Sequence, residues 1–268
     1  MTFFANTTSV LASSTDGAAT YKGEIAPNWD IAGNANGGYL LALAARAMAE
    51  TVERPHPVSV TCHYLAPAKR GPVTVDTTVV RAGRRFATVQ ARVSADKPLA
   101  QLLGMFGDMS LADEPNLLAT AVPPLPPVED CVKIEAGEPG GFPPDILRNI
   151  DARIHPEDTG AYGEGASGKA QIRGWFRLPN DQPLDTYTLL LAVDAFAPTS
   201  FNTGLPVGWT PTLELTAHIR GLPEPGWLRC FFSTRFITGG FLEEDGEIWD
   251  SSNRLVAQSR QLSLVARP

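Results

Sequence analysis

A short pattern that occurs twice in this 268-residue chain restricts the folds open to it. Three matches share nearly the same offset, 155 or 157 residues: Thr61-Cys62-His63 with Thr216-Ala217-His218, Gly71 with Gly226, and Ala100-Gln101 with Ala257-Gln258. Agreement of several short matches on nearly one offset favours duplication over coincidence. The chain is therefore predicted to contain two copies of one folding unit.

Alternating apolar and polar residues surround these matches in both halves. The first half has such segments at residues 58–64, 73–81 and 86–93, followed by an apolar stretch at 99–105. The second half has corresponding segments at residues 213–219, 227–236, 241–249 and 254–265. Alternation of this kind is typical of strands with one buried face. Each half therefore predicts an antiparallel meander.

A helix that is apolar on almost every face precedes each set of strands. Residues 37–51 combine large apolar side chains with five alanines, and residues 186–197 are similarly apolar and stop before Pro198. A helix that is apolar all round is a buried helix, and proline is a frequent helix terminator. One buried helix followed by a meander predicts an α+β unit in which a sheet wraps around its helix.

Charge and composition exclude several classes of protein. The formal net charge of -7 argues against a nucleic-acid partner, because phosphate recognition favours a basic surface. No apolar run approaches the ~20 residues that span a bilayer, and residues 1–14 lack the lysine or arginine that begins a signal peptide. Three widely separated cysteines favour reduced thiols. We therefore expect a cytoplasmic protein without a membrane span.

The two units are separated by a stretch rich in proline and glycine. No sustained periodicity is present between residues 122 and 168, which predicts a long linker with some local structure of its own. The expected organisation is a first unit at residues 1–115, a linker at 116–167 and a second unit at 168–268.

Asp194 is the only residue between Thr186 and Ser200 whose side chain is charged at neutral pH, and this segment is predicted to be buried. A buried carboxylate must be hydrogen-bonded or must shift its pKa. Burial raises its basicity towards working pH, which suits a general base. A carboxylate that bonds a local backbone amide, or faces water at the helix end, is an equally good interpretation from the sequence.

A buried helix that opens with Gly37-Gly38-Tyr39 and precedes a meander resembles the hotdog fold. Two such copies resemble the double-hotdog acyl-CoA thioesterases, bacterial thioesterase II and its actinobacterial relatives, over roughly residues 20–115 and 168–266. The resemblance implies two tandem hotdog units that form a pseudo-dimer with one continuous sheet. It also implies an acyl-CoA thioester hydrolase of fatty acid metabolism that uses no cofactor or metal and that could form a homo-oligomer.

The same resemblance implies a catalytic trio. The family carries an aspartate on the second helix, which Asp194 matches, a threonine at the strand that follows, which Thr212 matches, and a glutamine near the last strand. Alignment on Leu-Val-Ala selects Gln261 as the glutamine, although Gln258 lies three residues away. Without the resemblance, the better interpretation of Thr212 and of either glutamine is an ordinary strand residue with no catalytic role.

The repeat indicates which half holds this trio. The first-half counterparts of Thr212 and Gln261 are Pro57 and Gly104, and neither has a side chain that can orient water. The site is therefore expected in the second unit alone.

The first helix is expected to complete the site. Amides at a helix start can stabilise a developing oxyanion, and the resemblance implies this substrate-binding role for Gly37, Gly38 and Tyr39, with Asn36 beside them. An asparagine N-cap followed by glycines needed for close packing is the alternative, and both interpretations can hold together.

A basic cluster is a weaker candidate for the phosphates of CoA. Arg84 and Arg85 are its proposed contacts, and Lys69, Arg70 and Arg81 belong to the same cluster. Guanidinium groups bind phosphates well, but such clusters are more often solvated surface.

Two other functions stay open from the sequence. The fold could serve as a non-catalytic module that binds acyl-CoA or an acyl carrier. A hotdog enoyl-CoA hydratase is a further alternative, but its resemblance requires a histidine five residues after the aspartate, where this chain has Thr199.

Overall fold

The first half of the chain forms one long helix and five strands. The computed structural model describes residues 3–14, 18–109, 117–162 and 165–266. The elements of this half are β2 (Ala18–Ile25), α2 (Gly37–Val52), β5 (His56–Tyr64), β6 (Gly71–Ala82), β7 (Phe86–Ser94) and β8 (Pro98–Gly107). Four strands and the helix fall where the sequence pattern predicts them, and β2 adds a strand before the helix.

The second half repeats this order of elements. They are β11 (Gln171–Arg177), α3 (Thr186–Ala192), β12 (Thr212–Ile219), β13 (Leu228–Ser233), β15 (Phe241–Trp249) and β16 (Leu255–Leu264). The helix α3 ends at Ala192, five residues earlier than predicted. The amide of Asp194 bonds to the Leu191 carbonyl at 3.1 Å, so the chain turns and leaves Asp194 just beyond the helix.

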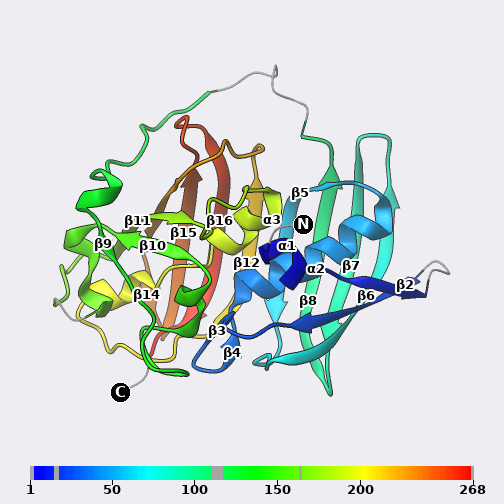
Figure 1. Cartoon of the computed structure of the whole chain (residues 1–268), viewed down its shortest axis with the longest axis horizontal. Coiled ribbons are helices and arrows are strands. Elements are labelled where there is room, and N and C mark those ends of the chain that lie inside the picture. Colours follow the sequence, from blue (N-terminus) through cyan, green and yellow to red (C-terminus); the bar gives the residue numbers. More distant parts are fainter. Residues whose placement is uncertain (1–2, 15–17, 110–116, 163–164, 267–268) are drawn as a thin grey trace.

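One continuous antiparallel sheet contains both halves (Figure 1). Its central order is β2-β6-β7-β8-β5-β12-β16-β15-β13-β11, so the second half repeats the first in reverse. The repeated threonines face each other at the junction: Thr61 pairs with Thr216, and their hydroxyl oxygens lie 2.9 Å apart. The predicted double-hotdog architecture is confirmed, with the repeat centred on the β5–β12 pair.

Shorter elements complete the fold. The large sheet is extended at its edges by β1 (Leu11–Ser14), β10 (Asp151–Ile154) and β9 (Val132–Lys133), and β14 (Ile237–Thr238) pairs with β15. A separate two-stranded sheet contains β3 (Asp30–Ile31) and β4 (Asn34–Ala35), and α1 (Phe3–Thr7) is a short helix. Strands β9 and β10 come from the segment predicted as a linker and continue the sheet beyond β11. These two strands therefore share the sheet of the second half.

The helix α2 is buried as predicted. Eleven of its residues are buried, among them Leu41, Leu43 and Met48, and it packs against the sheet and against α3 (Figure 1). None of the helices in the described ranges has the length and apolar character needed to cross a membrane. Packing of the two helices brings the start of α2 to the end of α3.

Candidate active site

The start of α2 is fixed by Asn36. The Asn36 backbone is extended, and its side-chain oxygen accepts a hydrogen bond from the Tyr39 amide at 2.9 Å. This is the usual role of asparagine at a helix N-cap. Its side-chain nitrogen points the other way and donates to the backbone oxygen of Asp194 at 2.7 Å. One side chain therefore joins the start of α2 to the residue that follows α3.

Gly37 and Gly38 allow the two helices to approach closely. A Cβ atom at Gly38 would lie 2.7 Å from the Leu190 carbonyl oxygen and 2.9 Å from that of Leu191. A Cβ atom at Gly37 would lie 2.9 Å from the Asp194 carboxylate. Real Cβ atoms do not tolerate such contacts with backbone, so only glycine fits at Gly38 without a shift of α3.

Asp194 lies against the start of α2. Its Oδ2 atom accepts hydrogen bonds from the Gly38 amide at 2.8 Å and from the Asn36 side chain at 3.0 Å. The carboxylate lies deep within the protein but keeps part of its surface open to a cavity. Burial raises the pKa of Asp194 from 3.8 to about 6, while the hydrogen bonds from Gly38, Gly37 and Asn36 oppose the rise. At neutral pH the group is therefore ionised but more basic than an ordinary aspartate.

Thr212 and Gln261 lie on the same cavity as Asp194. The Thr212 hydroxyl donates to the Gln261 side-chain oxygen at 3.2 Å and accepts from the Ser263 hydroxyl at 3.3 Å. Gln261 and Ser263 alternate along β16 on its buried face. Gln258 does not line this cavity, so of the two glutamines only Gln261 shares it with Asp194 and Thr212.

A second buried carboxylate, Glu244, lies behind Gln261. Its Oε1 atom accepts from the Gln261 side-chain nitrogen at 2.7 Å, and its Oε2 atom accepts from the Thr199 amide at 2.8 Å. Burial raises the pKa of Glu244 from 4.5 to about 7, and the charge of Asp194 adds to the rise against these hydrogen bonds. Sequence reasoning missed this residue. Alternation along β15 places it on the same face as buried Leu242 and Ile248, and that signal could have found it.

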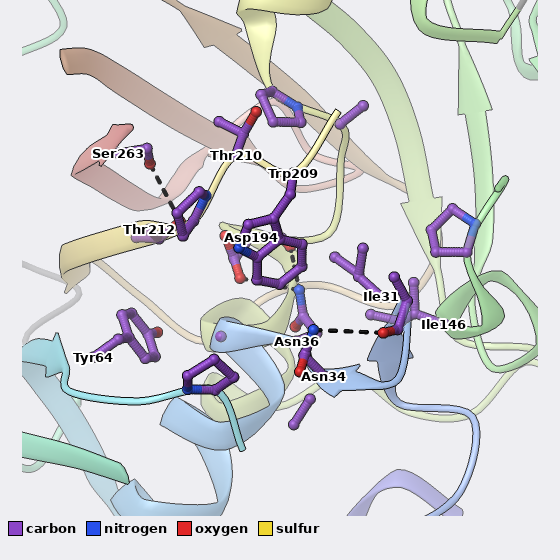
Figure 2. Close-up of a pocket in the computed structure, with 18 of the residues that line it drawn as sticks. Ile31, Asn34, Asn36, Tyr64, Ile146, Asp194, Trp209, Thr210, Thr212 and Ser263 are labelled. Atoms are coloured by element: carbon purple, nitrogen blue, oxygen red, sulfur yellow. Dashed lines mark hydrogen bonds between the residues drawn. The ribbon is translucent and has the colours of Figure 1, made fainter. Parts of the chain in front are cut away.

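The cavity itself has a volume of about 630 Å³. Figure 2 shows Asn36, Tyr64, Asp194 and Thr212 around it. Much of the remaining wall is apolar: Ile31, Leu40, Phe142, Ile146, Leu147, Tyr162, Phe196, Phe201 and Trp209. Four of these residues come from the segment between the halves, which therefore forms part of the cavity wall. A cavity with an apolar wall and a few polar groups suits an apolar chain attached to a polar reacting group.

Other predicted site residues lie elsewhere. The Tyr39 amide is already bonded to Asn36, and its buried ring stacks on Trp29 with centroids 5.0 Å apart. Arg84 and Arg85 are in the turn between β6 and β7 and do not line the cavity. Across the described ranges, no three histidine, cysteine, aspartate or glutamate side chains gather as a metal site.

Both halves match known sequence families. Residues 25–107 match the acyl-CoA thioesterase N-terminal domain, and residues 128–265 match the acyl-CoA thioesterase C-terminal domain. The chain belongs to the acyl-CoA thioesterase family. Its second family domain begins at residue 128, within the segment whose strands continue the second half of the sheet.

Two solved structures and one sequence relative are similar to this chain over nearly their whole length. A candidate thioesterase II from Thermobifida fusca has 29% sequence identity and a TM-score of 0.87, with 100% of this chain and 98% of that chain covered. A hotdog-fold protein of unknown function from Alicyclobacillus acidocaldarius has 22% sequence identity and a TM-score of 0.85, with 100% of this chain and 99% of that chain covered. An uncharacterized Mycobacterium tuberculosis protein is 28% identical over 91% of this chain and 90% of its own length.

Proposed function

We propose that this chain hydrolyses an acyl-CoA thioester to a free acid and CoA, with Asp194 as the general base. One observation carries the proposal: a desolvated carboxylate faces a largely apolar cavity that Thr212 and Gln261 also line. A base with a pKa near 6 is ionised at neutral pH and is basic enough to take a proton from water during attack. Thr212 and Gln261 offer a hydroxyl and an amide that can hold this water.

The reaction then needs only water and the thioester. Water attacks the carbonyl carbon while Asp194 accepts one of its protons, and the carbonyl oxygen becomes an oxyanion. The intermediate collapses with cleavage of the carbon–sulfur bond, and the CoA thiolate leaves. The proton on Asp194 passes to the thiolate or to solvent, which restores the base. A thiolate is a good leaving group, so no strong general acid is required.

The start of α2 would stabilise charge in this reaction. Asn36 and Gly37 line the cavity, whereas Gly38 does not. The Gly38 amide donates to the Asp194 carboxylate, so we assign Gly38 a positioning role. The oxyanion would lie near Gly37, where the positive end of the helix dipole stabilises it. The Asn36 side chain and the Gly37 amide already donate to Asp194, so we assign both of them a positioning role as well. Tyr39 is left out of the proposed site, because its amide bonds to Asn36 and its ring packs against Trp29.

The pH dependence of turnover tests the proposed base. Thiol release from acyl-CoA esters of different chain lengths should show kcat/KM rising with pH and levelling above an apparent pKa of about 6. Below that value the rate should fall roughly tenfold per pH unit, because protonated Asp194 cannot accept a proton. A rate that does not change between pH 5 and pH 8 would contradict the assignment. Binding of acyl-CoA without cleavage of any ester would instead favour the alternative function, a non-catalytic module that binds acyl-CoA.

Glu244 is proposed to act through Gln261 as a positioning residue. In Glu244→Gln, the new amide cannot accept from both the Thr199 amide and the Gln261 side chain as the carboxylate does. Gln261 should then lose its fixed orientation. We expect kcat to fall by roughly 10- to 100-fold, the cost of misplacing a catalytic group by about 1 Å, while KM changes little.

Glu243→Gln is the matched control for this variant. Glu243 is adjacent on β15 and interacts with Arg235, away from Gln261. It should retain wild-type turnover. Equal losses of kcat in the two variants would indicate a general effect on the strand and would remove Glu244 from the proposed site.

A further inference from the structure

A second cavity, of about 870 Å³, adjoins the candidate active site. Its wall comes from β2, the segment between β5 and β6, the start of β6 and the turn between β7 and β8. Asn34 and Pro67 line both cavities. The two cavities are therefore neighbours.

The second cavity is strongly basic. Its wall includes Lys22, Lys69, Arg70 and Lys97, which we call the basic basin, and a single carboxylate, Asp96, among the described residues. All four cationic side chains belong to exposed residues. None of the ion pairs within the described ranges involves them. In a chain with a net charge of -7, a concentration of unpaired positive charge in one concavity indicates an anionic ligand.

We propose that the basic basin binds the phosphate groups of CoA while the thioester lies in the first cavity. This inference rests on the proposed function. CoA carries a diphosphate and a separate ribose phosphate at the far end of its pantetheine arm, so it requires several cations beside, but not within, the reaction site. The lysine ammonium groups and the Arg70 guanidinium provide charge-assisted hydrogen bonds to phosphate oxygens.

Strand register supports the basic basin, and not the arginines of the β6–β7 turn, as the site for the CoA phosphates. Tyr64, on the wall of the first cavity, pairs with Ala100, which pairs with Val93. These residues lie at the end of the sheet where Thr74 pairs with Ser94 beside the basin.

Arg84 and Arg85 are at the opposite end of this hairpin. Ala82 pairs with Ala87 there, and the eight residue-to-residue steps from Thr74 to Ala82 span roughly 26 Å of strand. The turn arginines are therefore separated from the active-site end of this hairpin by most of the length of its strands.

Binding of free CoA tests the basin without requiring turnover. Calorimetric titration would compare wild type with the double variants K69A/R70A and K22A/K97A. All four residues are exposed, so the fold should be retained. Loss of phosphate contacts should raise the Kd for CoA by about tenfold or more in each double variant. Phosphopantetheine, which lacks the adenylate phosphates, should bind wild type more weakly than CoA and lose less affinity in the variants.

R84A/R85A removes the same formal charge elsewhere and is the matched control. Its Kd for CoA should stay within about twofold of wild type, because screening makes distant exposed charges nearly independent. Wild-type affinity in both basin variants, or an equal loss in the control, would overturn the proposal. CoA binding no tighter than phosphopantetheine would also overturn it, and would favour an acidic carrier protein as the partner. Basin-dependent CoA binding without cleavage of any ester would support the basin and contradict only the proposed hydrolysis.

Discussion

Asp194→Asn is expected to lower kcat/KM for acyl-CoA hydrolysis by roughly 10²- to 10⁴-fold, the usual contribution of a general base, while the protein stays folded. A single carboxylate oxygen accepts the hydrogen bonds from both Gly38 and Asn36. The asparagine oxygen can accept both of them, so the junction of the helices is preserved. Only the ability to accept a proton is lost, and acyl-CoA binding should change little.

The same substitution should stabilise the fold at pH 8. Folding raises the pKa of Asp194 from 3.8 to about 6, so the folded state holds the proton more tightly than the unfolded state. The ionised carboxylate therefore lowers the unfolding free energy of wild type as pH rises from about 4 to about 7. The shift corresponds to at most about 3 kcal/mol, and contact with the cavity should make the effect smaller. Urea unfolding at pH 8 and pH 4 measures it.

Asp181→Asn is the control for both measurements. Asp181 is a surface aspartate with an 89% exposed side chain, paired with Arg177. Its replacement should leave turnover unchanged and shift stability by no more than about 1 kcal/mol. Wild-type turnover in Asp194→Asn would show that another group activates the water.

Gly38→Ala is expected to damage both stability and turnover. A methyl group at Gly38 would lie 2.7 Å from the Leu190 carbonyl oxygen and 2.9 Å from that of Leu191. These are backbone atoms, so relief requires α3 to move away from α2. We expect a loss of about 1–3 kcal/mol in unfolding free energy. Movement of α3 also displaces Asp194, and a displacement of about 1 Å can lower kcat roughly 10²-fold.

Gly221→Ala separates this effect from a general effect of replacing glycine. A methyl group at Gly221 meets nothing within 4 Å, and its φ is not positive. This variant should match wild type in thermal unfolding and in kcat. In a helix that has room for a methyl group, alanine is more stable than glycine by about 1 kcal/mol. Unchanged or increased stability in Gly38→Ala would therefore mean that α2 and α3 are not in close contact at Gly38.

The fold could be predicted because its main constraints are local in the sequence. The apolar faces of α2 and the alternating strands each produce a pattern within a short window, and the repeat that contains Thr61 and Thr216 appears as short matches at nearly one offset. Asp194 was detectable for the same reason, as a lone charged residue in an apolar segment. These patterns cannot show that Thr61 and Thr216 meet, which follows from the antiparallel pairing of β5 with β12.

Parts of the site depend on contacts that no short window contains. The basic basin brings together Lys22, Lys69 and Lys97, which approach one another only because β2 pairs with β6 and β6 with β7. The position of Asp194 just beyond α3 involves Asn36, whose side chain donates to the Asp194 carbonyl from the N-cap of α2. Sequence spacing alone carries no information on either arrangement.

The most direct test of the proposed mechanism is a single-turnover reaction in ¹⁸O-labelled water, with enzyme in excess over acyl-CoA. Direct attack by a water activated by Asp194 places the label in the free acid released in the first turnover and leaves the protein unlabelled. An unlabelled acid, with ¹⁸O found in the Asp194 carboxylate by mass spectrometry of the protein, would instead identify Asp194 as a nucleophile and contradict its role as a general base.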